Sequence, residues 1–191
     1  MMNKPLLTSK DIRFEPPSFS IKDLLEVVKD AYGLSGTLKP LAGERDQNHM
    51  LQTHGKGKYL VKVAGANEDR SVVDYQIKTL HHIEQKSPQL NIPRNLKTLT
   101  GEDFVLIRDE VGKEHLLRLL TFLDGVPFGD DYEPSLETLY DAGRFQGQMC
   151  AALIDFSHPS EGYFMPWDIS QGLVLSPSLH VSQYGDVERL V

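Results

Sequence analysis

Residues 38–63, LKPLAGERDQNHMLQTHGKGKYLVKV, decide the fold. They contain two runs with strand-like alternation, at 49–53 and 59–63, and they complete a third that begins at residue 37 and ends at 41. A polar loop separates the run 37–41 from the run 49–53, and the tight turn 54–57 separates the run 49–53 from the run 59–63. Alternation with a period of two, bounded by turn formers, is typical of strands joined as hairpins. We therefore predict a three-stranded antiparallel sheet here.

Helical patterns flank this sheet. Ser20 is placed to cap a helix over 22–32, with Asp23 as a weaker capping box and Gly33 at its end. Further helices are expected over 68–85 and 134–156, and further strands over 95–99, 104–108 and 115–121. The order of elements predicts an α+β fold. The last helix carries these residues at helical spacing: Leu136, Leu139, Gly143, Gly147, Cys150 and Ile154.

Composition excludes several classes of protein. The 191-residue chain has a net charge of -7, which argues against nucleic acid as a partner because a phosphate backbone binds basic surfaces. No apolar run approaches the roughly 20 residues that span a bilayer, so no membrane partner is expected. The single cysteine cannot form an internal disulfide and fits a reducing compartment. We expect a cytoplasmic protein.

Lys62 is the first candidate functional residue. It alternates out of phase with Val61 and Val63, so its side chain leaves the opposite face of the strand. One interpretation is a lysine that extends from a sheet edge into water. The other is a fixed cation for the phosphates of a nucleotide.

The loop before this strand pair favours the second interpretation. A turn between strands can present backbone N–H groups to a phosphate, and a glycine permits close approach. The turn 55–58, GKGK, lacks the spacing and the hydroxyl residue of a Walker A loop. The candidate phosphate-binding residues of the loop are Gly43, Glu44, Arg45, Asp46, Gln47 and Asn48.

The helix after Lys62 is expected to supply a partner for its ammonium group. Gln76 falls on the inward side of this helix and could accept a hydrogen bond from Lys62 without neutralising its charge. Asp74 is acidic but lies about 200° around the helix from Gln76. Glu68 and Asp69 stand at the helix start. The sequence leaves these alternatives open.

Five segments together resemble a known family. They are LAGERDQNHML, YLVKVAGANED, VVDYQIKTLHHI, LLRLLTFLDGVPF and DFSHPSEGYFMPWDIS. They are similar to the N-terminal half of hydroxylysine-kinase-like proteins, members of the aminoglycoside/choline phosphotransferase superfamily. Domains of this type also occur fused to class III aminotransferases. The resemblance covers residues 38–168 well and 169–191 weakly.

The resemblance implies a kinase-like N-lobe over 37–123, preceded by an N-terminal extension and helix over 1–36. A linker would follow over 124–133, and 134–191 would begin a truncated helical C-lobe. It also implies ATP or GTP with Mg²⁺ as cofactor, and a hydroxylated amine as phosphoryl acceptor if the rest of the C-lobe is supplied. The hinge strand that reads the base would comprise Leu120, Thr121, Phe122 and Leu123.

Other residues receive narrower expectations from the resemblance. Leu41, Val61 and Phe122 are candidates to sandwich the base. Structural roles are expected for four residues that invite functional ones: strand-face positions for His115 and Arg118, packing for Trp167, and a turn or cap for Asp168. In the last helix, Gly143 and Gly147 are expected to permit close helix packing, and Cys150 to be an inert core residue.

The sequence departs from this family in one respect. The superfamily's catalytic loop resembles HGDLxxxN, and no His-Gly-Asp occurs here. The chain ends before a catalytic base or metal ligand appears, so we expect no catalytic or metal residues and no activity of the chain alone. The alternative is a module derived from a kinase lobe that binds a nucleotide or a protein without turnover. An exposed apolar face on the helix over 134–156 would then also permit self-association.

Overall fold

The computed structural model describes residues 16–55, 57–126, 133–165 and 168–170. The chain divides into two units, one spanning residues 15–161 and the other comprising the remaining terminal residues. The first unit contains the sheet and the helices that pack on it. Among the described residues, no helix combines the length and the apolar character that crossing a bilayer requires.

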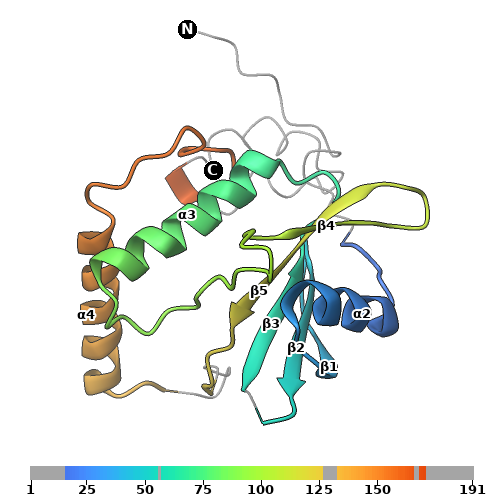
Figure 1. Ribbon diagram of the computed structural model, residues 1–191. Coiled ribbons are helices and arrows are strands. Elements are labelled where there is room, and N and C mark those ends of the chain that lie inside the picture. The colour runs from blue at the N-terminus through green and yellow to red at the C-terminus, as the bar shows by residue number, and fades with distance from the viewer. Residues whose placement is uncertain (1–15, 56, 127–132, 166–167, 171–191) are drawn as a thin grey trace, which may run out of the picture. The chain divides into compact units, whose positions relative to one another are not determined.

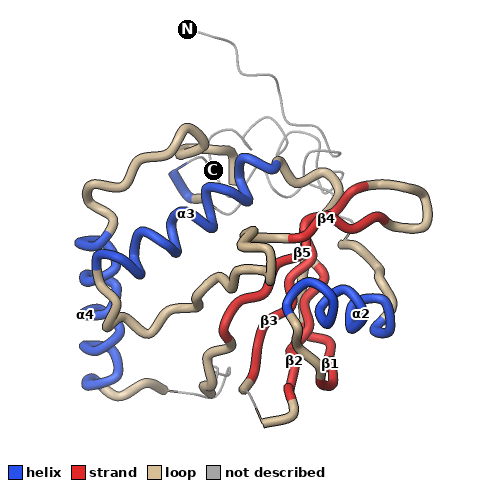
Figure 2. The backbone as a smooth tube through the Cα atoms, in the orientation of Figure 1, coloured by secondary structure: helices blue, strands red, loops and turns tan. Residues whose placement is uncertain are grey.

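A five-stranded antiparallel sheet forms the centre of this unit, with the strands in the order β1-β2-β3-β5-β4 (Figures 1 and 2). Its N-terminal half is the predicted hairpin pair, β1 (Gly36–Leu41), β2 (Gln47–Thr53) and β3 (Lys58–Val63). β5 (Glu114–Thr121) pairs with β3 and also with β4 (Val105–Arg108), so it lies between them. The sheet therefore combines three strands that precede the helix at residues 70–86 in the sequence with two strands that follow it.

The strand predicted over 95–99 is absent, and this expectation was wrong. Only Asn95 forms a bridge, to Leu120. The edge of β5 that this segment reaches is already divided, because β4 pairs with its first half, from Glu114 to Leu117. The segment contacts only the second half, where Leu96 N–H donates to Leu119 C=O at 2.9 Å.

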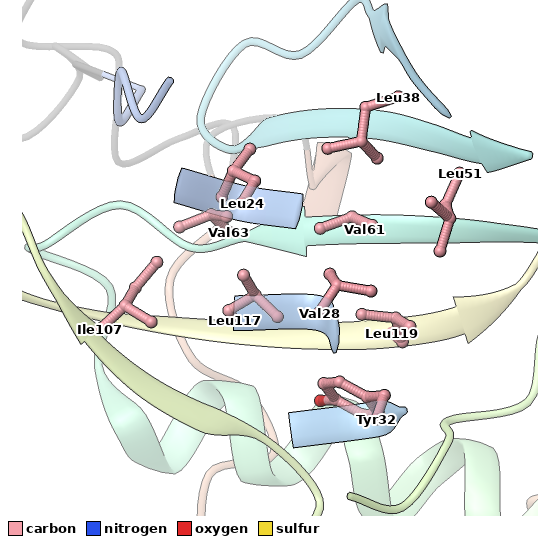
Figure 3. Close-up of a cluster of buried hydrophobic side chains, with 10 residues drawn as sticks. All are labelled: Leu24, Val28, Tyr32, Leu38, Leu51, Val61, Val63, Ile107, Leu117 and Leu119. Atoms are coloured by element: carbon pink, nitrogen blue, oxygen red, sulfur yellow. The ribbon is translucent and has the colours of Figure 1, made fainter. Parts of the chain in front are cut away.

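Helix α2 (Ile21–Tyr32) covers one face of the sheet (Figure 1). Its ends follow the sequence prediction. The Ser20 side chain accepts a hydrogen bond from Asp23 N–H at 3.1 Å, and Gly33 takes the left-handed conformation, with φ 66°, that ends the helix. The core beneath α2 consists of Leu24, Val28, Tyr32, Leu38, Leu51, Val61, Val63, Ile107, Leu117 and Leu119 (Figure 3).

Helix α3 (Arg70–Lys86) supplies Val73 and Ile77 to a second, smaller cluster with Ala64 and Leu116. Leu116 alternates with the residues of β5 that face α2, so α3 packs on the other side of the sheet. Toward its C-terminal end, α3 contributes Ile83 to a third cluster with Ala152 of α4 (Leu136–Ala152). Thus α2 and α3 lie on opposite faces of the sheet, and α4 packs against α3.

The face of α4 that packs is not the one that the sequence pattern suggested. Phe145, Met149 and Ala152 contact the α3 cluster, whereas Leu136 and Ile154 are 86% and 88% exposed. Two expectations for this helix were wrong. A Cβ added at Gly143 or Gly147 would meet nothing within 4 Å, so these glycines permit no close packing among the described residues. Cys150, expected in the core, is exposed.

Candidate functional site

A row of polar side chains crosses the face of the sheet opposite α2. Lys62 on β3 stands opposite Asn48 on β2 and opposite Arg118 on β5. The residues on either side of Lys62, Val61 and Val63, are fully buried against α2. Strand alternation therefore places two cations in adjacent positions on the face that α3 shares.

Asp46 is the acidic partner of Lys62. Its carboxylate forms an ion pair with the Lys62 ammonium group, and the two side chains are 17% and 24% exposed. Gly43 shapes the loop that carries Asp46, because a Cβ at this position would lie 2.2 Å from the Asp46 carbonyl oxygen. The group that approaches Gly43 closely is therefore the backbone of the same loop.

A second ion pair lies beside the first. Arg45 donates to the Glu68 carboxylate at 2.6 Å, which ties the β1–β2 loop to the segment just before α3. Burial raises the pKa of Glu68, and the charges of Arg45, Lys62 and Arg118 oppose this rise while Asp46 adds to it. Glu68 therefore lies within the electrostatic field of all three cations.

Arg118 is the most deeply buried charge of this group, with 5% of its surface exposed. It donates through Nη2 to the neutral side-chain oxygen of Gln76 on α3. Its Nη1 is buried and has no hydrogen-bond partner in the described part of the chain. Burial lowers the pKa of Arg118, against the effects of Asp46, Glu68 and Tyr32, but a guanidinium remains protonated in proteins.

These six residues define the cationic cluster: Arg45, Asp46, Lys62, Glu68, Gln76 and Arg118. Three cations stand against two carboxylates, which leaves one excess positive charge. Each carboxylate is engaged by a different cation, Asp46 by Lys62 and Glu68 by Arg45. Arg118 is left with an amide alone, so the cluster fits the binding of an additional anion.

The carboxylate that pairs with Lys62 is therefore none of the candidates on or just before α3. Gln76 faces the sheet but bonds Arg118. Asp74 points elsewhere and lies 3.0 Å from His158 Nε2. Asp69 caps α3, where its carboxylate accepts a hydrogen bond from Ser71 N–H at 2.8 Å. The β1–β2 loop, rather than α3, supplies the carboxylate that pairs with Lys62.

The other loop candidates separate into two groups. Gln47 exchanges two hydrogen bonds of 2.8 Å with the backbone of Phe19, so it secures the segment before α2 instead of joining the cationic cluster. Asn48 lies beside Lys62, donates weakly to Ala42 C=O at 3.4 Å, and keeps a buried side-chain oxygen without a described partner. Glu44 is exposed.

Of the four expected hinge residues, Leu120 and Thr121 end β5, and Phe122 and Leu123 follow it. The N–H of Thr121 donates to Arg94 C=O at 2.9 Å, and the N–H of Phe122 donates to Lys58 C=O at 3.2 Å. Both groups are thus engaged within the chain. Leu120 is buried, and Leu123 is exposed.

The remaining sequence candidates are distributed around the unit. Val61 is buried against α2, on the face opposite Lys62, so it cannot sandwich a base beside that lysine; Leu41 is exposed at the end of β1. His115 is buried, with its ring 3.0 Å from Ala64 C=O and 3.3 Å from Asp109. In the other unit, Asp168 accepts a hydrogen bond from Ser170 N–H at 2.9 Å, as a cap does. Trp167 lies outside the described residues.

A groove of about 390 Å³ borders the cationic cluster at Glu68. Residues 65–68 of the β3–α3 connection and Arg70 at the start of α3 form one wall, and Leu106, Lys113, Glu114 and Leu116 form the other. Lys62 does not line it. Among the described residues, no group of three or more His, Cys, Asp or Glu side chains is placed to hold a metal ion.

Sequence reasoning assigned Arg118 a strand-face role and did not recognise its place beside Lys62. A usable signal was present in LLRLLT, residues 116–121, where one arginine interrupts an apolar strand. The argument that drew attention to Lys62, a cation maintained within an apolar strand, applies equally to this arginine.

No protein-family model matches this sequence, and no curated protein matches it. Solved structures do. An amicoumacin kinase in complex with AMP-PNP, Ca²⁺ and "Ami" superposes with a TM-score of 0.60 at 14% identity, covering 85% of this chain and 53% of the kinase. A microcompartment-associated aminopropanol kinase superposes with a TM-score of 0.61 at 13% identity, covering 84% of this chain and 49% of the kinase. The chain spans about half the length of these kinases, and its fold is that of the corresponding part of a small-molecule kinase.

Proposed function

We propose that this chain is the nucleotide-binding portion of a small-molecule kinase. The observation that carries the proposal is the cationic cluster, in which Lys62 and Arg118 stand side by side on a kinase-like sheet with one positive charge in excess. ATP or GTP, with Mg²⁺, supplies the polyphosphate in this proposal. The nucleotide itself would bring the anion that the cluster lacks, and Lys62 would hold it.

Calorimetric titration with Mg·ATP and Mg·GTP tests this proposal. Lys62→Ala should weaken binding by about tenfold or more, because a charge-assisted contact to phosphate is lost. Lys29→Ala is the matched control, since it removes the same charge from the exposed surface of α2, on the other side of the sheet. Equal affinities of wild type and Lys62→Ala would show that Lys62 does not contact the phosphates.

The acceptor class is the finer part of the proposal. It rests on the resemblance to hydroxylysine-kinase-like proteins and on the solved kinases, one of which is named for aminopropanol. We propose a hydroxyl group of an amino acid, amino alcohol or aminoglycoside as acceptor in the whole kinase. Because the sequence contains no HGDLxxxN segment, the chain alone would bind nucleotide without transferring phosphate. The isolated chain can be assayed with Mg·ATP and a panel of amino acids, amino alcohols and aminoglycosides. Transfer of phosphate to any of these compounds would contradict the proposal.

One observation favours a second candidate function, a protein-binding module. Leu136, Leu139 and Tyr140 on α4 are all at least half exposed, which is typical of a surface that contacts another protein. Sedimentation velocity over a range of concentrations tests self-association through this surface. The double variant Leu136→Gln, Leu139→Gln should then stay monomeric, whereas Val111→Gln, which removes an equally exposed residue from the β4–β5 turn, should behave as wild type.

A further inference from the structure

The starting observation is the register of two strands. Lys62 and Arg118 are direct partners in the β3–β5 ladder, where side chains on the same face lie about 5 Å apart. Like charges in this position repel each other and destabilise the sheet. The chain therefore maintains two adjacent cations at a cost, and this cost falls when an anion lies between them.

Asp46 provides that anion in the free protein, but for one cation only. Its carboxylate pairs with Lys62, and it is near enough to Arg118 to act on the pKa of the guanidinium. Arg118 has no ion pair among the described residues, and its Nη1 is buried without a hydrogen-bond partner there. The Asp46 carboxylate, which is held by the β1–β2 loop, therefore leaves donors of this site without an acceptor, and the site could bind further acceptor oxygens.

A phosphate group satisfies this site more completely than a carboxylate does. It offers three acceptor oxygens and up to two negative charges, whereas a carboxylate offers two oxygens and one charge. The planar guanidinium presents its N–H donors in a fork that matches two phosphate oxygens, while the ammonium group of lysine acts as a point charge. The pair combines both kinds of donor.

We propose that Lys62 and Arg118 together form a two-cation site for one phosphate group of the nucleotide, and that the Asp46 carboxylate occupies this site until the phosphate displaces it. The proposal rests on the proposed function and extends it in two respects: Arg118 becomes a binding residue, and the β1–β2 loop becomes a competitor of the ligand. Gly43, by allowing this loop to fold onto itself, positions the competing carboxylate.

Removing the competitor is the first test, with tripolyphosphate, Mg·ATP and adenosine as separate probes in calorimetry on the 191-residue chain. Asp46→Asn keeps the shape of the side chain and should tighten binding of tripolyphosphate and Mg·ATP on the order of tenfold, with adenosine unchanged. Asp30→Asn, the same change at an exposed position of α2, should leave all three affinities at their wild-type values. Unchanged or weaker tripolyphosphate binding by Asp46→Asn would overturn the proposal.

A double-mutant cycle separates displacement from a general change of charge. If Asp46 acts by occupying Lys62, the gain from Asp46→Asn should largely disappear in a Lys62→Met background, because the two residues then no longer interact. A gain that persists at full size would show that Asp46 acts only through the overall field, and the displacement would be rejected.

Two variants test Arg118. Arg118→Lys retains the charge but loses the fork, and it should weaken tripolyphosphate binding about tenfold while adenosine binding stays the same. Since a substitution at this buried position can impair folding, Gln76→Glu offers an independent route. It gives Arg118 a carboxylate of its own and should likewise weaken tripolyphosphate binding. Wild-type affinity in a folded Gln76→Glu or Arg118→Lys protein would exclude Arg118 from the site.

These experiments distinguish a failure of the proposed function from a failure of the two-cation site. If neither wild type nor Asp46→Asn binds nucleotide or tripolyphosphate, the proposed function itself fails. If wild type binds Mg·ATP through Lys62 but the Asp46 and Arg118 variants bind as wild type does, the proposed function stands and the two-cation site is wrong.

Discussion

His158 Nε2 lies 3.0 Å from a carboxylate oxygen of Asp74, although 84 residues separate the two in sequence. The same imidazole tilts against the ring of Tyr75, with centroids 5.4 Å apart, and Phe156 stacks on that ring at 5.9 Å. The segment that follows α4 is therefore held along α3 by the contact between His158 and Asp74, by these aromatic contacts, and by Asp155, which pairs with Lys86 and lies 3.0 Å from His82 Nε2. This fastening is a local feature, distinct from the cationic cluster.

His158→Ala should release the segment after α4. We expect faster amide hydrogen exchange over residues 155–161 and a loss of about 1 kcal/mol in unfolding free energy, since the hydrogen bond to Asp74 and an aromatic contact disappear. Exchange in the sheet should not change. The exposed His54, in the β2–β3 turn, provides the control substitution His54→Ala. Unaltered exchange over 155–161 would show that His158 does not hold this segment.

Gln76→Leu should destabilise the protein by about 2 kcal/mol, because the buried Arg118 would lose its hydrogen-bond acceptor. Chemical denaturation at neutral pH measures the difference. Gln85→Leu makes the same change at an exposed position of the same helix and should have little effect. Equal losses in the two variants would mean that the bond to Arg118 contributes nothing to stability.

Gly43→Ala should destabilise the β1–β2 loop, since the new Cβ would lie 2.2 Å from the Asp46 carbonyl oxygen and 2.7 Å from Asn48 Nδ2. We expect a loss of about 1–3 kcal/mol in thermal or chemical unfolding. Gly143→Ala is the opposite case. It lies within α4 with open space around it and should stabilise the protein by about 0.5–1 kcal/mol through helix propensity. A neutral Gly43→Ala would show that the loop can open without cost.

Ionisation of the buried Tyr32 hydroxyl should lower the stability of the folded protein at alkaline pH. Burial raises the pKa of this hydroxyl from 10.0 to about 12, so the folded protein retains the proton after the unfolded chain has released it. The contribution is fully present below pH 10 and is lost as pH rises through 12, a change of about 3 kcal/mol. Denaturant titrations between these pH values should show wild type losing stability relative to Tyr32→Phe. Parallel curves for the two proteins would refute the shift.

Local patterns were sufficient to predict most of the fold. Ser20 and Gly33 set the ends of α2 because capping depends on residues adjacent in sequence, and the alternation over 49–53 and 59–63 gave the strands for the same reason. The strand expected over 95–99 was wrong because pairing depends on a distant partner. Its edge of β5 was shared with β4, which no local pattern reveals.

The helix over 134–156 shows a different limit. Its pattern correctly indicated an apolar face, but a periodicity states only which residues share a face and not what covers it. Phe145 and Met149, on another side of the helix, make the packing contacts with α3. Cys150 was assigned to a core on the strength of its neighbours in the pattern, and it is exposed.

The candidate site was predictable only in part. Lys62 was found because strand alternation isolates it from its apolar neighbours. Its pairing with Asp46 depends on how a loop folds back, and the bond between Gln76 and Arg118 depends on how α3 lies over the sheet. Such contacts arise from tertiary packing, which sequence periodicity does not encode.

The facing pair of Lys62 and Arg118 also has a consequence for how the sheet assembles. A slip of one residue by either strand would turn the cation of that strand toward α2, Lys62 in place of Val61 or Arg118 in place of Leu119. An unpaired charge would then be forced into a hydrocarbon interior, which is prohibitive. The charged row thus disfavours misaligned pairing of β3 and β5, so the two residues proposed to bind phosphate also favour the native strand alignment.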